Sequence, residues 1–187
     1  MSDRLPFIQI AQSAMCVPPT QNLSISLDIK ILPDTAATGN PFYGVWLLDN
    51  SGSMDGDRID KAKESLIRQV EKLPIGTGFN LVTFESSIHD IIKDETISDK
   101  NRPKIINYIQ KITAGGGTAL YHVLEHAIKM VRGYKGPLPK KIILITDGEP
   151  GDVPVRMGDE KDPNYQKFFL LAREALEYKA SIDTVGA

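Results

Sequence analysis

Cysteine is almost absent from this sequence, since Cys16 is the only one among its 187 residues. A single cysteine excludes an intramolecular disulfide and the paired CxxC motifs of zinc and redox sites. Long apolar runs are also missing, because no stretch approaches the roughly 18 apolar residues of a membrane-spanning helix. The N-terminal residues lack the apolar segment of a secretion signal. We therefore expect a cytoplasmic protein with no membrane partner.

The sequence also lacks an excess of either charge. Its 22 basic residues nearly balance its 24 acidic ones, which leaves a net charge of −2. Such a balance provides no long-range field toward nucleic acid or an anionic membrane surface. We expect no nucleic-acid partner, and any protein partner must be recognised through a local site.

The first 40 residues differ in pattern from the rest. Residues 23–31 alternate strictly between apolar and polar side chains, which predicts a strand with one polar face. One-sided strands are typical of antiparallel sheets. Residues 33–41 contain prolines, Gly39 and Asn40 and predict a linker. We expect residues 1–40 to form a β-rich flank with its linker, and residues 41–187 to form the main domain.

The main domain alternates short apolar runs with stretches of helical periodicity, which predicts an α/β doubly wound fold with a mainly parallel sheet. The chain ends directly after a predicted strand, whereas such sheets normally continue through a covering helix. We therefore expect the domain to continue beyond Ala187. The predicted strands cover residues 45–48, 79–84, 142–145 and 182–185, with an edge strand at 88–92, and the predicted helices cover 57–73, 103–112, 119–131 and 165–178.

Oxygen-bearing side chains follow three of these predicted elements. Asp49, Ser51 and Ser53 come directly after the first buried strand of the main domain. Thr118 ends a run of three glycines before a helix, and Asp147 follows another buried strand. Ligands of open parallel sheets bind at the carboxyl ends of the strands. The sequence therefore predicts that these five residues meet at that edge.

The chemistry of this set favours a hard divalent cation. Three hydroxyls and two carboxylates, without sulfur or imidazole, suit Mg²⁺ or Mn²⁺, and Ca²⁺ is also compatible with oxygen ligands. Because only two of the five ligands are charged, a bound ion would keep positive character and an exchangeable water. A carboxylate from another molecule could take that position. We predict a metal-dependent protein-binding module that recognises an Asp or Glu of its partner, and no enzymatic activity.

These residues resemble the metal-ion-dependent adhesion site of the von Willebrand factor A domains, which combines DxSxS with a distant Thr and a distant Asp. The resemblance covers about residues 42–187 and implies a Rossmann-like fold. It implies that Ser51, Ser53 and Thr118 contact the ion directly, whereas Asp49 and Asp147 act directly or through water. Intracellular members of the family often act beside AAA+ ATPases, kinases or phosphatases, which suggests an assembly or regulatory subunit.

An alternative function is a metal-dependent hydrolase that uses the same site or a second motif. His122, Glu125 and His126 spell HxxEH, the inverted zinc-protease motif. Helical periodicity instead places the two histidines opposite the buried stripe, facing water. The metal loops also lack an evident general base or nucleophile, so we expect binding rather than catalysis.

Two positions beside the first loop allow different interpretations. Asp57 is predicted to cap the helix that follows, or it could extend an acidic rim around the site. Met54 is expected either to contact a partner from an exposed position or to pack over the loop.

Overall fold

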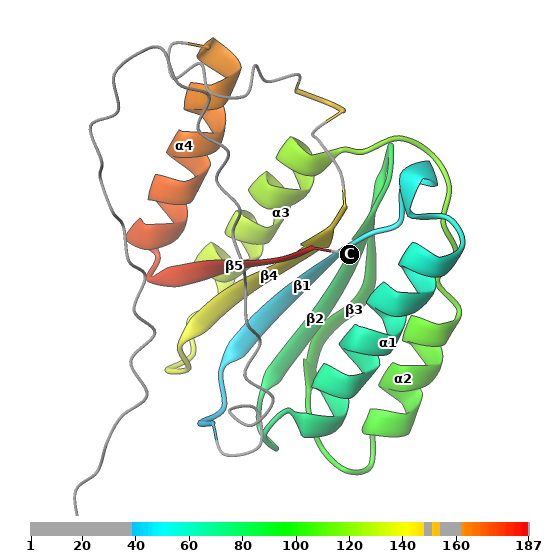
Figure 1. Ribbon diagram of the computed structural model, residues 1–187. Helices are drawn as coiled ribbons and strands as arrows, with labels where there is room; N and C mark the ends of the chain where they lie inside the picture. Colours follow the sequence, from blue (N-terminus) through cyan, green and yellow to red (C-terminus); the bar gives the residue numbers. More distant parts are fainter. Residues whose placement is uncertain (1–38, 148–150, 154–161, 187) are drawn as a thin grey trace, which may run out of the picture. The chain divides into compact units, whose positions relative to one another are not determined.

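The computed structural model describes residues 39–147, 151–153 and 162–186 (Figure 1). The predicted strand at residues 23–31 and Cys16 lie outside the described residues, and the division at residue 40 stays a prediction. The described elements are, in chain order, β1 (Tyr43–Asp49), the short 3₁₀ helix η1 (Gly52–Met54), α1 (Asp57–Lys72), β2 (Gly78–Phe84), β3 (Ile88–Thr96), α2 (Arg102–Gln110), α3 (Leu120–Gly133), β4 (Lys140–Thr146), α4 (Pro163–Glu177) and β5 (Ala180–Gly186).

The described strands form one five-stranded sheet in the order β3-β2-β1-β4-β5. β1 lies at its centre and pairs in parallel with β2 and β4, and β4 pairs in parallel with β5. β3 is antiparallel to β2 and occupies an edge, as predicted, but it extends to Thr96 rather than ending near residue 92. The predicted α/β fold with a mainly parallel sheet is confirmed.

Alternate residues of β1 point to opposite faces of the sheet. Trp46 and Leu48 pack with residues of α1 and α2, whereas Val45 and Leu47 pack with residues of α3 and α4. Helices therefore cover both faces of the central strand, and all seven of its residues are buried. This double coverage explains the continuous apolar run, because neither face of the strand meets water.

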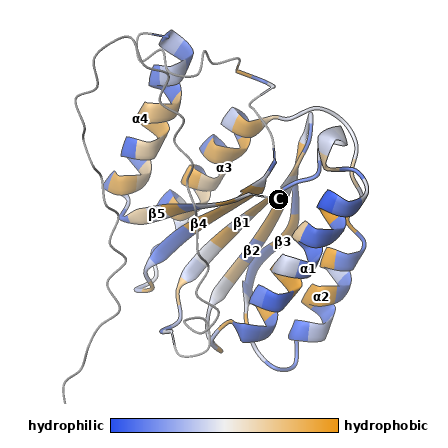
Figure 2. Cartoon of the chain, in the orientation of Figure 1, coloured by the Kyte–Doolittle hydropathy of each residue, from blue (hydrophilic) through white to orange (hydrophobic). Residues whose placement is uncertain are grey.

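The helices carry the apolar stripes that their periodicity predicts. In α1 the buried residues recur at spacings of three and four, and Figure 2 shows hydrophilic residues beside hydrophobic ones along the same helix. The predicted cap of this helix is wrong, because Gly56, with φ of 76°, precedes the first turn and no side chain caps it. Asp57 is instead the first helical residue. No helix within the described ranges is long and apolar enough to cross a bilayer.

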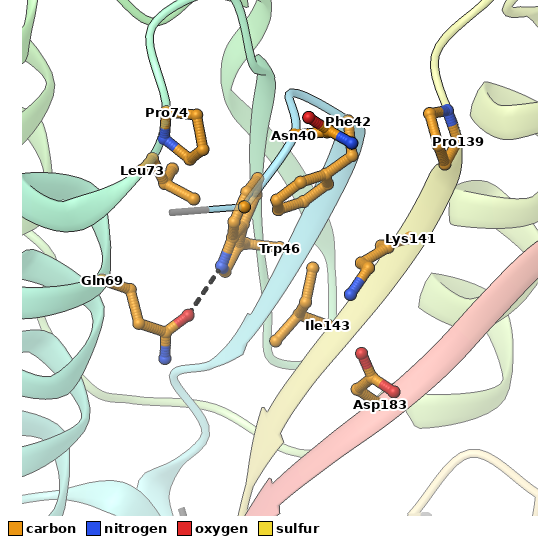
Figure 3. Close-up of a pocket in the computed structure, with 11 residues that line it drawn as sticks. Asn40, Phe42, Trp46, Gln69, Leu73, Pro74, Pro139, Lys141, Ile143 and Asp183 are labelled. Atoms are coloured by element: carbon orange, nitrogen blue, oxygen red, sulfur yellow. Dashed lines mark hydrogen bonds between the residues drawn. The ribbon is translucent and has the colours of Figure 1, made fainter. Parts of the chain in front are cut away.

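A pocket of about 410 Å³ lies at the amino ends of β1 and β4. Figure 3 shows Trp46 between Gln69 of α1 and Ile143 of β4, and its indole Nε1 donates a hydrogen bond of 3.0 Å to Gln69 Oε1. Phe42 and Lys141 line the same pocket. The predicted metal loops follow the opposite ends of these strands, so the pocket is separate from the candidate site.

Candidate metal centre

Asp49 ends β1 and is completely buried. Its Oδ1 accepts a hydrogen bond of 2.8 Å from the backbone N–H of Ser51, and its Oδ2 accepts one of 2.5 Å from Thr146 Oγ1. Both donors are neutral and belong to the loop after β1 or to the end of β4. The carboxylate is therefore held in place by the scaffold, and each oxygen keeps a lone pair for another ligand.

The two serine hydroxyls continue from this carboxylate toward β4. Ser51 Oγ and Ser53 Oγ lie 3.0 Å apart, and Ser53 Oγ donates a hydrogen bond of 3.1 Å to Asp147 Oδ1. Only 5% of the Asp147 side chain is exposed. Four of the five predicted ligands therefore form one connected set, although Ser53 and Asp147 are 94 residues apart in sequence.

The glycine run lies directly against the loop that follows β1. Gly52 N donates a hydrogen bond of 2.9 Å to Gly116 O, and Gly115 N donates one of 2.8 Å to Asn50 O. Gly116 has φ of 80°, in the left-handed region that favours glycine. These bonds join the second predicted loop to the first.

Thr118 follows this run and precedes α3. Its carbonyl oxygen accepts hydrogen bonds of 3.0 and 3.2 Å from the N–H groups of Gly151 and Asp152. Within the described residues, its side chain makes no hydrogen bond to the other four predicted ligands. The structure therefore brings the Thr118 loop to the site without linking this hydroxyl into the hydrogen-bonded set.

Arg58 also belongs to the site, although no pattern in the sequence predicted it there. This residue stands in the first turn of α1, and its Nη1 donates hydrogen bonds to Asp147 Oδ2 and, at 3.2 Å, to the backbone oxygen of Ser53. Its side chain is 58% exposed. A basic residue in the first turn of the helix after the DxSxS loop was the available signal, but helical periodicity assigns it only to a solvent face.

Met54 is completely buried, so it packs beneath the loop and offers no exposed contact to a partner. It lies in the same cluster as residues of α1 and α2. The interpretation of Met54 as an exposed contact is therefore wrong. Burial of this side chain anchors the short helix η1, which carries Ser53 and follows Ser51.

The histidines of α3 contact two different carboxylates. His122 Nδ1 lies 2.7 Å from Asp152 Oδ2, and His126 Nε2 lies 2.7 Å from Asp90 Oδ1. His122 is exposed as predicted, whereas the His126 side chain is half-buried against β3, with 32% exposed. No group of three or more His, Cys, Asp or Glu side chains in the described part of the chain could hold a metal ion.

Asp152 is a second residue whose contacts no sequence pattern predicted. Its carboxylate accepts hydrogen bonds of 3.2 and 3.0 Å from the backbone N–H groups of Tyr121 and His122 in the first turn of α3. The helix has no side-chain cap from its own N-cap residue, Ala119. Asp152 therefore satisfies free donors of this helix from a loop 30 residues away.

Glu85 adds negative charge beside the glycine run. It follows β2, and its Oε2 accepts a hydrogen bond from the backbone N–H of Ser86. Hydrogen bonds from the backbone and hydroxyl of Ser86 lower the pKa of Glu85 below its ordinary value. The carboxylate is therefore ionised at neutral pH.

The donor chemistry of the site fits a hard divalent cation. Asp49 and Asp147 supply carboxylates, and Ser51 and Ser53 supply hydroxyls between them. These oxygen ligands are the types that Mg²⁺, Mn²⁺ and Ca²⁺ prefer. Half of these four side chains are neutral hydroxyls, so the set carries less negative charge than four carboxylates would.

Comparison with protein families matches residues 45–177 to the von Willebrand factor type A domain. Inter-alpha-trypsin inhibitor heavy chain 4 of Mus musculus is 32% identical over 114 residues, which cover 57% of this chain and 12% of that protein. An uncharacterized protein of Synechocystis is 24% identical over 168 residues, which cover 90% of this chain and 37% of that protein. The chain thus spans well under half the length of either relative.

Solved structures share the fold at low sequence identity. A von Willebrand factor type A protein from Catenulispora acidiphila aligns with a TM-score of 0.63 and 21% identity, covering 80% of this chain and 34% of that one. Manganese-loaded TRAP protein from Plasmodium vivax aligns with a TM-score of 0.58 and 19% identity, covering 78% of this chain and 57% of that one.

Proposed function

Because the chain belongs to the von Willebrand factor type A domain family, whose members include metal-dependent adhesion and protein-interaction modules, we propose that it is a divalent-metal-dependent protein-binding module. The proposed ligands are Asp49, Ser51, Ser53, Thr118 and Asp147, which together would make a complete metal-ion-dependent adhesion site. Mg²⁺ or Mn²⁺ is the proposed ion, and Ca²⁺ is compatible with the same oxygens.

The observation that carries the proposal is the connected set of oxygen ligands from Asp49 to Asp147. Contacts of 3.0 Å between the serine hydroxyls and 3.1 Å from Ser53 to Asp147 join side chains from two strand ends. Asp49 is held by two neutral donors, so its position does not depend on a bound ion. A site that is already assembled loses little conformational entropy when a ligand binds.

The ligand balance supports recognition of a carboxylate. Two carboxylates and three hydroxyls bring a formal charge of −2, and hydroxyls donate less electron density than carboxylates would. A bound divalent ion would supply an electrophilic position that an Asp or Glu of a partner protein can occupy. The chain's own side chains would hold the remaining positions and orient that partner group.

We propose binding rather than catalysis, and a cytoplasmic role as an assembly or regulatory subunit beside a partner such as an AAA+ ATPase, kinase or phosphatase. The near-neutral net charge of −2 and the single cysteine are compatible with this role. The five proposed ligands contain no imidazole or thiol that could act as a base or nucleophile. Metal-dependent turnover of a phosphoester or peptide panel, lost in Asp49→Ala, would favour the hydrolase alternative instead.

Calorimetric titration of Mn²⁺ and Mg²⁺ tests the proposal. We expect saturable 1:1 binding by the wild-type chain and affinity about tenfold lower or weaker in Asp49→Asn, because a charged ligand becomes a neutral one. Asp60→Asn is the matched control, since it makes the same change on a side chain that is 71% exposed on α1. No binding by the wild-type chain, or equal loss in both variants, would refute the site.

Partner recognition is tested in a second titration. A peptide with a central Glu is added to the metal-loaded chain, and the same peptide with Gln in its place serves as the control. We expect the Glu peptide alone to bind, and only when metal is present. Binding that persists in EDTA, or that does not distinguish Glu from Gln, would contradict recognition through the ion.

A further inference from the structure

Arg58 places a positive charge directly on the candidate metal centre. Its guanidinium Nη1 donates hydrogen bonds to Asp147 Oδ2 and to the backbone oxygen of Ser53, so it contacts two of the five proposed ligands. We propose that the guanidinium of Arg58 takes the place of the metal ion in the metal-free protein. It pairs with the Asp147 carboxylate as a counter-cation and is displaced when a divalent ion binds. This inference rests on the proposed metal-binding function and concerns how the same site is regulated.

Asp147 needs a positive partner in the metal-free protein. Its side chain is only 5% exposed. A buried carboxylate without a compensating charge is unfavourable, because the protein interior solvates it less well than water does. Asp49 is also buried, but its two neutral donors already stabilise it. Within the described residues, Arg58 supplies the positive charge that lies against Asp147.

Arg58 is the member of this pair that can leave. Its side chain is 58% exposed and extends from the first turn of α1, so a change of rotamer can move the guanidinium into water. Asp147 follows β4, and its carboxylate is held from the other side by Ser53 Oγ at 3.1 Å. Displacement of Arg58 would therefore free Asp147 Oδ2 without moving the carboxylate.

The positive charge of Arg58 also opposes the ion directly. A guanidinium and a divalent cation that use the same carboxylate repel each other at short range. The free energy of binding must therefore include breaking the Arg58–Asp147 ion pair. We infer that Arg58 lowers the intrinsic metal affinity of the site, so that the site fills only when the ion concentration is sufficient or a partner carboxylate adds to the binding energy.

Metal affinity of Arg58 variants tests this inference. Calorimetric titration of Mn²⁺ into Arg58→Gln should show roughly threefold to tenfold tighter binding than wild type, because the competing charge is gone. Arg58→Lys keeps the charge and should stay closer to wild type. Arg68→Gln is the matched control, because Arg68 lies on the same helix, is 69% exposed and pairs with Glu64 at 3.1 Å. It should leave Mn²⁺ affinity unchanged.

Thermal unfolding separates this role from a purely structural one. In EDTA, Arg58→Gln should unfold at a lower temperature than wild type, because Asp147 loses its counter-charge. In saturating Mn²⁺ the difference should vanish or reverse. An Arg58 that only ties α1 to the loop would instead lower the unfolding temperature equally in both conditions, with no gain in affinity, and that result would overturn the inference.

The remaining outcomes are distinguishable. If wild type binds Mn²⁺ and Asp49→Asn does not, but Arg58→Gln binds no tighter, the metal site stands and the counter-cation role is refuted. If Arg58→Gln binds more weakly, Arg58 supports the loaded site, which also refutes the inference. If neither wild type nor Arg58→Gln binds the ion, both the proposed function and this inference fail.

Discussion

Thr146 Oγ1 donates a hydrogen bond of 2.5 Å to Asp49 Oδ2, which joins the carboxyl ends of β4 and β1 across 97 residues of sequence. The two strands are neighbours in the sheet, with Leu48 paired to Ile145. This pairing places the loops after β1 and β4 side by side, and the candidate metal centre lies where they meet.

Replacing Thr146 by valine should destabilise the metal-free protein by about 1–2 kcal/mol, because a buried carboxylate loses a neutral donor. Urea unfolding in EDTA measures this change. Thr146→Ser keeps a hydroxyl at the same position and should lose less. Equal stability of Thr146→Val and wild type would mean that this hydrogen bond does not hold Asp49.

Replacing Gly116 by alanine should destabilise the loop by about 1–3 kcal/mol and weaken Mn²⁺ binding. The new Cβ would collide with the Glu85 carboxylate, and φ of 80° is strained for alanine. Gly115→Ala is the control, because a Cβ at Gly115 meets nothing within 4 Å. Urea unfolding and Mn²⁺ titration of the two variants measure the difference, and matching losses would contradict the explanation.

Alanine at His122 or His126 should leave Mn²⁺ affinity unchanged, because neither side chain contacts the proposed ligands within the described residues. Titration of zinc should likewise show no stoichiometric site that depends on both histidines, since they contact Asp152 and Asp90 separately. Tight 1:1 zinc binding that both alanine variants abolish would instead support the inverted zinc-protease interpretation.

Deprotonation of the Tyr43 hydroxyl should lower the free energy of unfolding at alkaline pH. Burial, and secondarily the charge of Asp94, raise the pKa of Tyr43 from 10.0 to about 12. Below pH 10 the folded and unfolded states both keep this proton. Between pH 10 and 12 only the unfolded state releases it, so rising pH favours unfolding by up to about 1.4 kcal/mol per pH unit.

Urea unfolding of Tyr43→Phe across this pH range tests the assignment. The variant should show a shallower loss of stability than wild type, because its ring cannot ionise. Tyr108→Phe is the control, since it removes the same hydroxyl from a ring that is 39% exposed on α2. A slope that is unaffected by Tyr43→Phe would contradict a raised pKa.

The pattern of apolar residues in the sequence made much of the fold predictable. The apolar run at residues 45–48 predicted a strand covered on both faces, and β1 is buried along its whole length. Spacings of three and four predicted the buried stripes of α1 and α3, which pack on opposite faces of the sheet. Such patterns are local, because a strand or helix repeats its orientation every two or 3.6 residues.

Contacts between distant segments were not predictable in the same way. No local sequence pattern singled out Arg58 or Asp152, yet Arg58 binds Asp147 and Asp152 satisfies the first turn of α3. Asp57 is a good capping residue, but Gly56 occupies the N-cap position. Met54 is buried because α1 and α2 cover it. In each case the outcome depends on which segment folds against the residue.

The sequence by itself determined the elements, the mainly parallel sheet and the presence of oxygen-bearing side chains after β1 and β4. These properties follow from local periodicity and from the rule that the carboxyl ends of parallel strands share one edge of a sheet. Only the tertiary structure decided that Thr146 supports Asp49 and that Arg58 neutralises Asp147. Distances between side chains far apart in sequence are set by strand order, register and helix packing, and no local pattern encodes them.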